Sequence, residues 1–186
     1  MDILTAIGLA LPAGLNAYIP LLGLALAQRF GVLSLAQPWD TLGQWWVIAL
    51  VSVLLLVEVF ADKIPAVDHV NDAIQTVVRP AAGAVVAVAA SGQAGENYPI
   101  VMVALGVILA GGVHVAKASA RPIINATTGG TGAPAASTVE DVVSVVSTAL
   151  AIFIPILVLG VMGFFAWLAW RFTRGRTRGR TRLPDA

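Results

Sequence analysis

The feature that most limits how this chain can fold is a series of five long, mostly apolar runs with no Asp, Glu, Lys or Arg. The runs cover residues 3–28, 41–57, 80–95, 97–116 and 142–170. A helix needs about 20 apolar residues to cross the roughly 30 Å of hydrocarbon in a bilayer. The first, fourth and fifth runs reach this length directly, and the second reaches it with residues 58–61. The third is short but rich in alanine, which suits a helix packed among other helices.

The composition agrees with a membrane protein. Hydrophobic residues make up 58% of the chain and charged residues 11%, whereas a soluble domain carries about 25% charged residues. We therefore predict an all-α integral membrane protein with about five transmembrane helices in one compact unit. The chain has no cysteine, which excludes a disulfide scaffold, a thiol nucleophile and any metal site built on cysteine.

The charges divide the chain into a helical transmembrane domain, residues 1–170, and a basic tail, residues 171–186. The tail holds six arginines and one aspartate, a net charge of +5, and the first 170 residues hold five basic and nine acidic side chains, a net of −4. With five spans, a cytoplasmic C-terminus places Arg29 and the tail inside, as the positive-inside rule favours. We expect the N-terminus outside, the tail on anionic lipid in the cytoplasm, and no nucleic-acid binding.

The first run carries a signal for a broken helix, because Pro12 and Pro20 flank Gly14 and Asn16. Proline removes a backbone donor and glycine weakens a helix, so a continuous straight helix is not expected. Broken helices persist in membranes where the freed backbone groups meet protein, water or a solute. We predict a break with a packing role, with Asn16 as a candidate cavity residue; an ordinary proline kink is the alternative.

Two polar connections, residues 58–79 and 114–141, contain the ionisable side chains of most interest. The predicted topology places both connections at the same membrane face. Their entry sequences are alike: Val57-Glu58-Val59-Phe60-Ala61-Asp62-Lys63 and Val113-His114-Val115-Ala116-Lys117. The similarity suggests an internal duplication of a helix–connection–helix unit, a kind of repeat found in some transporters.

In the first connection, Pro65 is typical of the first position of a helix. Apolar residues recur behind it at helical spacing, with Asp68 and Asp72 on the polar side. Arg79-Pro80 is predicted to end this helix and to start the third span. Two interpretations remain open: an amphipathic helix in the membrane interface with a solvated polar face, or a helix folded back into the bundle to line a water-filled cavity.

The second connection contains Asn125, followed by Thr127-Thr128-Gly129-Gly130. Successive backbone N–H groups in a glycine-rich turn can hold an anion or a carbonyl-bearing solute, and a plain flexible turn is the alternative. Ser137-Thr138-Val139-Glu140 then fits a capping box, which predicts the start of the fifth helix.

Glu58 and His114 are the sharpest single signals, because each lies near the end of an apolar span. An ionisable group at depth costs about 2.5–3.5 kcal/mol on insertion scales, so such a group is normally paired. A Glu58–Lys117 or Asp62–Lys117 pair would join the two connections and need no transport function. A proton relay through Glu58 and His114 is the alternative.

We find no sequence motif for catalysis. The chain has neither His-Glu-x-x-His nor Gly-x-Ser-x-Gly, and its two histidines are too few for a site that needs three. A metal site could be built from Asp62, Asp68, His69 and Asp72, since oxygen ligands suit magnesium or calcium, but a solvated stripe explains these residues equally well. We therefore expect no enzyme activity, no metal and no cofactor.

Several short segments, taken in order, form a recognisable set. They are Gly14-Leu15-Asn16-Ala17 with Pro20, Asp62-Lys63-Ile64-Pro65 with Asp68, His114-Val115-Ala116-Lys117, Ala126-Thr127-Thr128-Gly129-Gly130, and Glu140-Asp141. Together they resemble a bacterial membrane-protein family catalogued as domain of unknown function 4126, over nearly the whole chain before the tail. The resemblance implies a small helical protein of the bacterial inner (cytoplasmic) membrane and supplies no activity, substrate or site.

The predicted function is a small ion or solute transporter or channel, working as a homo-oligomer. Glu58, Asp62 and His114 would be proton or cation relays, and Lys117 and Arg121 their charge partners. The predicted pathway residues are Asn16, Glu58, Asp62, Lys63, Asp68, Asp72, His114, Lys117, Arg121, Asn125, Thr127, Thr128, Gly129 and Gly130. The alternative is a non-catalytic structural or assembly subunit of a larger membrane complex, in which the polar residues pair internally.

Overall fold

A computed structural model describes residues 2–62, 65–129, 131–154 and 167; the side chains of residues 65–70 and 72 are outside this description. The regular secondary structure of the described residues is all helical, without a strand, which confirms the all-α prediction. Its elements are α1 (Ile3–Ala13), α2 (Tyr18–Arg29), the short 3-10 helix η1 (Trp39–Gly43), α3 (Trp45–Ala61), α4 (Pro65–Ala90), α5 (Gln93–Asn97), α6 (Pro99–Thr128) and α7 (Gly132–Phe153).

Three described helices are long and apolar enough to cross a membrane: the Ala73–Ala90 part of α4, α6, and α7. This indicates a membrane location. The apolar helix α3 has 17 residues, which span about 25 Å at 1.5 Å per residue. The count of five spans is not confirmed, and the part of the fifth run beyond residue 154 lies outside the described residues except for Trp167.

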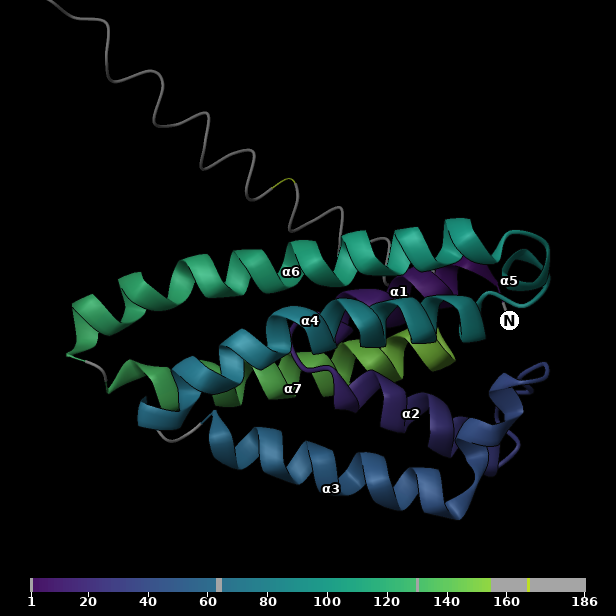
Figure 1. The fold of residues 1–186 in the computed structure, drawn as a ribbon, viewed down its shortest axis with the longest axis horizontal. Helices are drawn as coiled ribbons and strands as arrows, with labels where there is room; N and C mark the ends of the chain where they lie inside the picture. The colour runs from purple at the N-terminus through teal and green to yellow at the C-terminus, as the bar shows by residue number, and fades with distance from the viewer. Residues whose placement is uncertain (1, 63–64, 130, 155–166, 168–186) are drawn as a thin grey trace, which may run out of the picture.

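The first run does not cross as one helix, so the prediction of a single span over residues 3–28 is wrong. α1 and α2 form a hairpin with its turn at residues 14–17 (Figure 1). Asp2 before α1 and Ser34 after α2 line the same surface pocket, together with Gln93 of α5. Both ends of the hairpin therefore lie at one end of the bundle, which we call the α5 end. The predicted break is confirmed, but the chain also reverses direction there.

The hairpin reaches only part of the way through the bundle. α1 has 11 residues and α2 has 12, so each spans about 16–18 Å, roughly half of the hydrocarbon thickness. Gly14 allows the turn to press against α6, because a Cβ on Gly14 would lie only 2.6 Å from the Val113 Cβ. Asn16 Oδ1 accepts hydrogen bonds from the backbone N–H groups of Tyr18 and Ile19 at 3.1 and 3.2 Å, which caps the start of α2.

The hairpin also changes the orientation argument. Arg29 ends α2 at the α5 end, where the N-terminus also lies. The prediction placed Arg29 inside and the N-terminus outside, and these two placements cannot hold together. The reason is that the charge count assumed one crossing before Arg29, whereas the chain enters and returns.

α4 corrects the predicted boundary at Arg79-Pro80. The helix begins at Pro65, as predicted, and then continues without interruption through Pro80 to Ala90. Proline within a membrane helix is tolerated where neighbouring helices accommodate it. Here the Pro80 ring faces Gly111 of α6, where an added Cβ would lie 3.7 Å from Pro80 Cγ. From Pro65 onward, the first connection is therefore the first half of a long helix and not a separate segment.

The second connection is mostly helical as well. α6 continues past Lys117 and Arg121 to Thr128, and Gly129 ends it in the left-handed conformation with φ +61°. α7 begins at Gly132, so the prediction that the capping box at Ser137 starts this helix is wrong. Ser137 is buried inside α7, and its hydroxyl donates a hydrogen bond to Asp62 at 3.5 Å. The side chain that the capping pattern assigns to the helix start therefore makes a tertiary contact instead.

The helices pack through small residues at the centre of the bundle. Gly83 of α4 meets Gly106 of α6 so closely that a Cβ on Gly106 would lie 2.6 Å from the Gly83 carbonyl carbon. Small residues let helix backbones approach closely in membranes. The end of α3 and the start of α4, and likewise the end of α6 and the start of α7, lie at the end of the bundle opposite the α5 end (Figure 1). The two predicted connections therefore meet at one end of the bundle.

Candidate functional site

Ionisable side chains gather inside the bundle beyond the tip of the hairpin, and we call this group the polar cluster. The polar cluster comes from α3 and its C-cap, α4, α6 and α7, and consists of Glu58, Asp62, Arg79, His114, Lys117, Arg121 and Glu140. The Glu140 side chain is 18% exposed, and the other six residues are 0–5% exposed. Because buried charges are costly unless paired, the pairing within this cluster decides what it can do.

Arg79 lies at the inner part of the cluster and is fully buried. Its Nη2 donates to Glu58 Oε1 at 3.0 Å and lies 3.8 Å from Asp62 Oδ2. Its Nη1 lies 2.9 Å from His114 Nδ1. One guanidinium from α4 therefore joins a carboxylate of α3 to an imidazole of α6.

The contacts of His114 define the form of its ring. A guanidinium can only donate, so His114 Nδ1 must accept the hydrogen bond from Arg79. The proton of the neutral ring is then on Nε2, which lies 3.1 Å from Thr76 Oγ1 and donates to it. A proton added to Nδ1 would break the hydrogen bond with Arg79 and place two cations side by side.

Asp62 lies at the outer part of the cluster and collects several donors. Its Oδ2 accepts from Lys117 Nζ and Arg121 Nη2, both at 3.4 Å. Its Oδ1 accepts from Asn71 Nδ2 at 2.7 Å. Glu140 provides the second anion for the same cations, with its Oε2 at 2.8 Å from Lys117 Nζ and 3.4 Å from Arg121 Nη2.

Among the side chains that the structure describes, the cluster contains three carboxylates (Glu58, Asp62 and Glu140) and three cations (Arg79, Lys117 and Arg121). His114 accepts a hydrogen bond from Arg79 and is neutral in this arrangement. In each ion pair, the carboxylate and the cation come from different helices, with Asp62 counted as the C-cap of α3. The pairs link α3 to α4 through Glu58–Arg79, the C-cap of α3 to α6 through Asp62–Lys117, and α6 to α7 through Lys117–Glu140.

The tip of the hairpin is attached to the cluster. Lys117 Nζ donates to the Leu15 backbone oxygen at 3.2 Å, close to the C-terminal end of α1, where the helix dipole favours a cation. Asn16 Nδ2 donates to Asp141 Oδ1 at 3.0 Å. The polar cluster therefore contacts the point where two half-length helices end.

Three buried oxygen atoms near the cluster have no hydrogen-bond partner in the described residues. They are Glu58 Oε2, Gln75 Oε1 and Asn125 Oδ1. An unpaired buried acceptor costs about 1–3 kcal/mol and more when charged. Glu58 is thus paired through one carboxylate oxygen and left open at the other, which a proton or another donor could satisfy.

The structure confirms one of the two predicted pairings and not the other. Asp62 pairs with Lys117, as predicted, whereas Glu58 pairs with Arg79 instead of Lys117. The reason is reach: Arg79 extends from the middle of α4 to the level of Glu58, and Lys117 lies one helical turn beyond His114, beside Asp62 and Glu140.

Other predicted pathway residues lie elsewhere. Thr127, Thr128 and Gly129 are exposed in the last turn and cap of α6, and both hydroxyls donate to carbonyl oxygens of Ile123 or Ile124 in the same helix. Asn125 is half-buried. Lys63, Gly130 and the side chains of Asp68 and Asp72 lie outside the described residues, as does the basic tail, residues 171–186.

Sequence reasoning missed Arg79 and Glu140 as members of the cluster. Asn71, Gln75 and Arg79 are four residues apart, so they form one stripe on α4 that continues into the apolar run. That stripe was a usable signal. Glu140 was assigned to helix capping, and only the packing of α7 against α6 brings it to Lys117. In the part of the chain that the structure describes, no group of three or more His, Asp or Glu side chains could hold a metal.

Comparison with known proteins identifies the family. The model of the family described as "Domain of unknown function (DUF4126)" matches residues 3–175, and the chain belongs to this family. No curated protein and no solved structure matches the chain.

Proposed function

For a member of a family without an assigned activity, we propose a function from the geometry: a small transporter or channel for an ion or solute, in which the polar cluster is the gate. The observation that carries the proposal is a hairpin of two half-length helices that ends inside the bundle against buried, paired charges. Transporters commonly bind solutes and coupling ions near the bilayer midplane, where discontinuous helices end.

The depth of the cluster supports this proposal. Glu58 lies 13 residues after Trp45, which opens α3, a distance of about 20 Å. Lys117 lies 18 residues after Pro99, which opens α6, a distance of about 27 Å. In a hydrocarbon layer of about 30 Å, the cluster extends from the tip of the hairpin towards the opposite membrane face. It fills the half of the bundle that the hairpin leaves free.

The pairing pattern suits a gate. Glu58, Asp62 and His114 would bind a proton or cation, with Lys117 and Arg121 as their charge partners. A proton on the open oxygen of Glu58 would weaken its attraction to Arg79, and the balance of forces on Arg79 would then favour Asp62, 3.8 Å away. The exposed Thr127 to Gly129 segment would lie at the mouth of the pathway.

The test is ion flux into proteoliposomes that contain the purified protein, followed with a pH-sensitive dye and a small panel of ions. We expect flux in the unaltered protein, and loss of most of it in Glu58→Gln and His114→Ala. Glu96→Gln is the matched control, because Glu96 is an exposed carboxylate on α5. Flux that is the same in Glu58→Gln, His114→Ala and Glu96→Gln would remove the cluster from the pathway.

A second candidate is a non-catalytic structural or assembly subunit of a larger membrane complex. The observation in its favour is that each carboxylate of the cluster already has a cation within 3.4 Å, so the network can serve to hold helices in register. This candidate predicts a partner that co-purifies at fixed stoichiometry in mild detergent. Isolation of a homo-oligomer with ion flux and no partner would contradict it.

We further propose that the basic tail is cytoplasmic and that the protein forms a homo-oligomer in the bacterial inner membrane. The chain has no cysteine, so single-cysteine variants can be labelled with a membrane-impermeant maleimide. Ser34→Cys at the α5 end and Thr131→Cys at the opposite end should react from opposite sides, and a cysteine in the tail should react only after cells are opened. Light scattering in detergent gives the oligomer number.

A further inference from the structure

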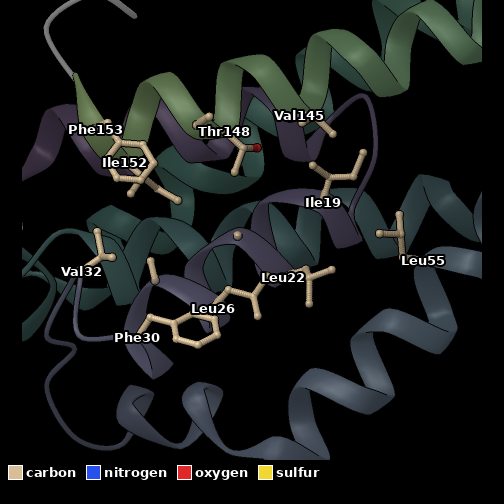
Figure 2. A pocket seen from close by; sticks show the side chains of 13 residues that line it. Ile19, Leu22, Leu26, Phe30, Val32, Leu55, Val145, Thr148, Ile152 and Phe153 are labelled. Carbon is tan, nitrogen blue, oxygen red and sulfur yellow. The ribbon is translucent and has the colours of Figure 1, made fainter.

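An apolar groove lies between α2, α3 and α7, with a volume of about 380 Å³. Figure 2 shows its lining side chains, which come from these three helices and the segment after α2. The residues that matter here are Ile19, Leu26 and Phe30 of the α2 side, Leu55 of α3, and Ala149 and Phe153 of α7. Small-molecule sites have volumes of about 300–1,000 Å³ and mostly apolar walls, so the groove is large enough for a ligand.

The groove runs along α2 from Ile19 near the tip of the hairpin to Phe30 at the α5 end. Eleven residues of helix span about 16 Å, which is about half of the roughly 30 Å hydrocarbon layer. The length of the groove therefore matches one leaflet of a bilayer. A linear apolar chain that enters from the membrane surface would end near the hairpin tip.

A positive charge stands at the outer end of the groove. Arg29 is exposed, and its guanidinium carbon lies 4.7 Å from the centre of the Trp45 ring at the start of α3. Tryptophan is enriched at the headgroup level of membranes, so this pair marks the membrane surface at the α5 end. Phe30, the next residue, lines the groove and is 70% exposed.

We propose that this groove is a binding site for one anionic phospholipid. One acyl chain would lie in the groove between α2 and α7, and the phosphate would pair with Arg29 beside Trp45. Charge at one end, apolar walls along one leaflet, and a mouth at the headgroup level are the three features that such a lipid requires. The proposal depends on the membrane location and not on transport, so it can fail or succeed independently of the gate.

The test is native mass spectrometry of the full chain in detergent, titrated with palmitoyl-oleoyl phosphatidylglycerol or with phosphatidylcholine of the same acyl chains. We expect one tightly bound phosphatidylglycerol with about fivefold higher affinity than phosphatidylcholine, which corresponds to about 1 kcal/mol for one basic residue at the surface. The tail arginines also attract anionic lipid, so the comparison is made between variants that all keep the tail.

Two pairs of variants separate the headgroup from the acyl chain. Arg29→Gln should lose the fivefold preference, and Arg29→Lys should retain it. Ala149→Phe places a ring in the groove from an exposed position, and should weaken both lipids at least tenfold. Val146→Phe is its matched control, because Val146 is exposed on the same helix and does not line the groove.

Four results would overturn the proposal. Equal affinity for the two lipids, or a preference that survives Arg29→Gln, would remove the headgroup contact. Unchanged lipid binding in Ala149→Phe, with both α7 variants folded by circular dichroism, would place the lipid outside the groove. No bound lipid on the unaltered protein would show that the groove is not a lipid site.

Discussion

Arg79→Met is the substitution that examines the polar cluster most directly. Methionine keeps most of the length of the side chain and removes the charge. Glu58, which is 2% exposed, then loses the partner at 3.0 Å, and His114 Nδ1 loses its donor at 2.9 Å. Removing one partner of a buried ion pair costs about 3–5 kcal/mol, because the remaining charge stays buried. For a chain of this size, we expect the midpoint of thermal unfolding to fall by roughly 10 °C.

The assay is unfolding of the purified protein in detergent, by heat or by added SDS, followed by tryptophan fluorescence. The double variant Glu58→Gln/Arg79→Met removes the stranded carboxylate and should regain at least half of the lost stability. Arg29→Met is the matched control, because Arg29 is exposed and stacks on Trp45. Such an exposed cation–π contact contributes about 0.5–1 kcal/mol.

Two results would refute this reasoning. If Arg79→Met costs no more than Arg29→Met, the buried pair does not stabilise the bundle in the way the distances indicate. If the double variant is as unstable as Arg79→Met alone, the unpaired Glu58 carboxylate is not the source of the loss. In either case the charge pairing would no longer explain why these helices stay together.

Three further predictions concern the fold. Gly106→Ala should destabilise the bundle by more than about 2 kcal/mol, because its Cβ would lie 2.6 Å from the α4 backbone. Gly112→Ala is the control, because the space around Gly112 is open, and it should be neutral or stabilising by up to about 1 kcal/mol in the same unfolding assay. Asn16→Ala should cost about 1–2 kcal/mol, since it removes the cap of α2 and the hydrogen bond to Asp141, and Asn16→Asp should also destabilise by placing two carboxylates together. The hydrogen bond from the Thr5 backbone N–H lowers the pKa of the Asp2 carboxyl. The ionised Asp2 cap therefore contributes its full stability above the ordinary pKa near 3.8, and this stability is lost as the pH falls through the lowered pKa. Asp2→Ala should remove this loss at acid pH, which is measured as the unfolding midpoint against pH.

The helical character and the membrane location follow from local properties of the sequence. Long apolar runs can cross a bilayer only as helices that satisfy their own backbone hydrogen bonds. The start of α4 at Pro65 and the break near Gly14 and Asn16 also follow from local chemistry, because proline and glycine act on their own backbone. These features were predictable without knowing what the residues contact.

The pairings were only partly predictable. Asp62 and Lys117 were expected to meet because each follows an apolar span that ends at the same face, and they do. Arg79 and Glu140 were assigned to a helix end and a capping box, since local patterns suggest those uses. The long α4 and α6 helices instead carry Arg79 and Lys117 inside the bundle, where Arg79 pairs with Glu58 and Lys117 pairs with Glu140 and Asp62.

The helical class, the membrane location and the backbone break between Pro12 and Pro20 follow from local sequence properties. The packing of the helices was needed to show that the break is a reversal, that the second polar connection is mostly helical, and that the described cations and carboxylates share one buried site. The two sets of properties differ in range. Backbone preferences and hydropathy act over a few neighbouring residues, whereas an ion pair such as Glu58–Arg79 forms only after separate helices have packed.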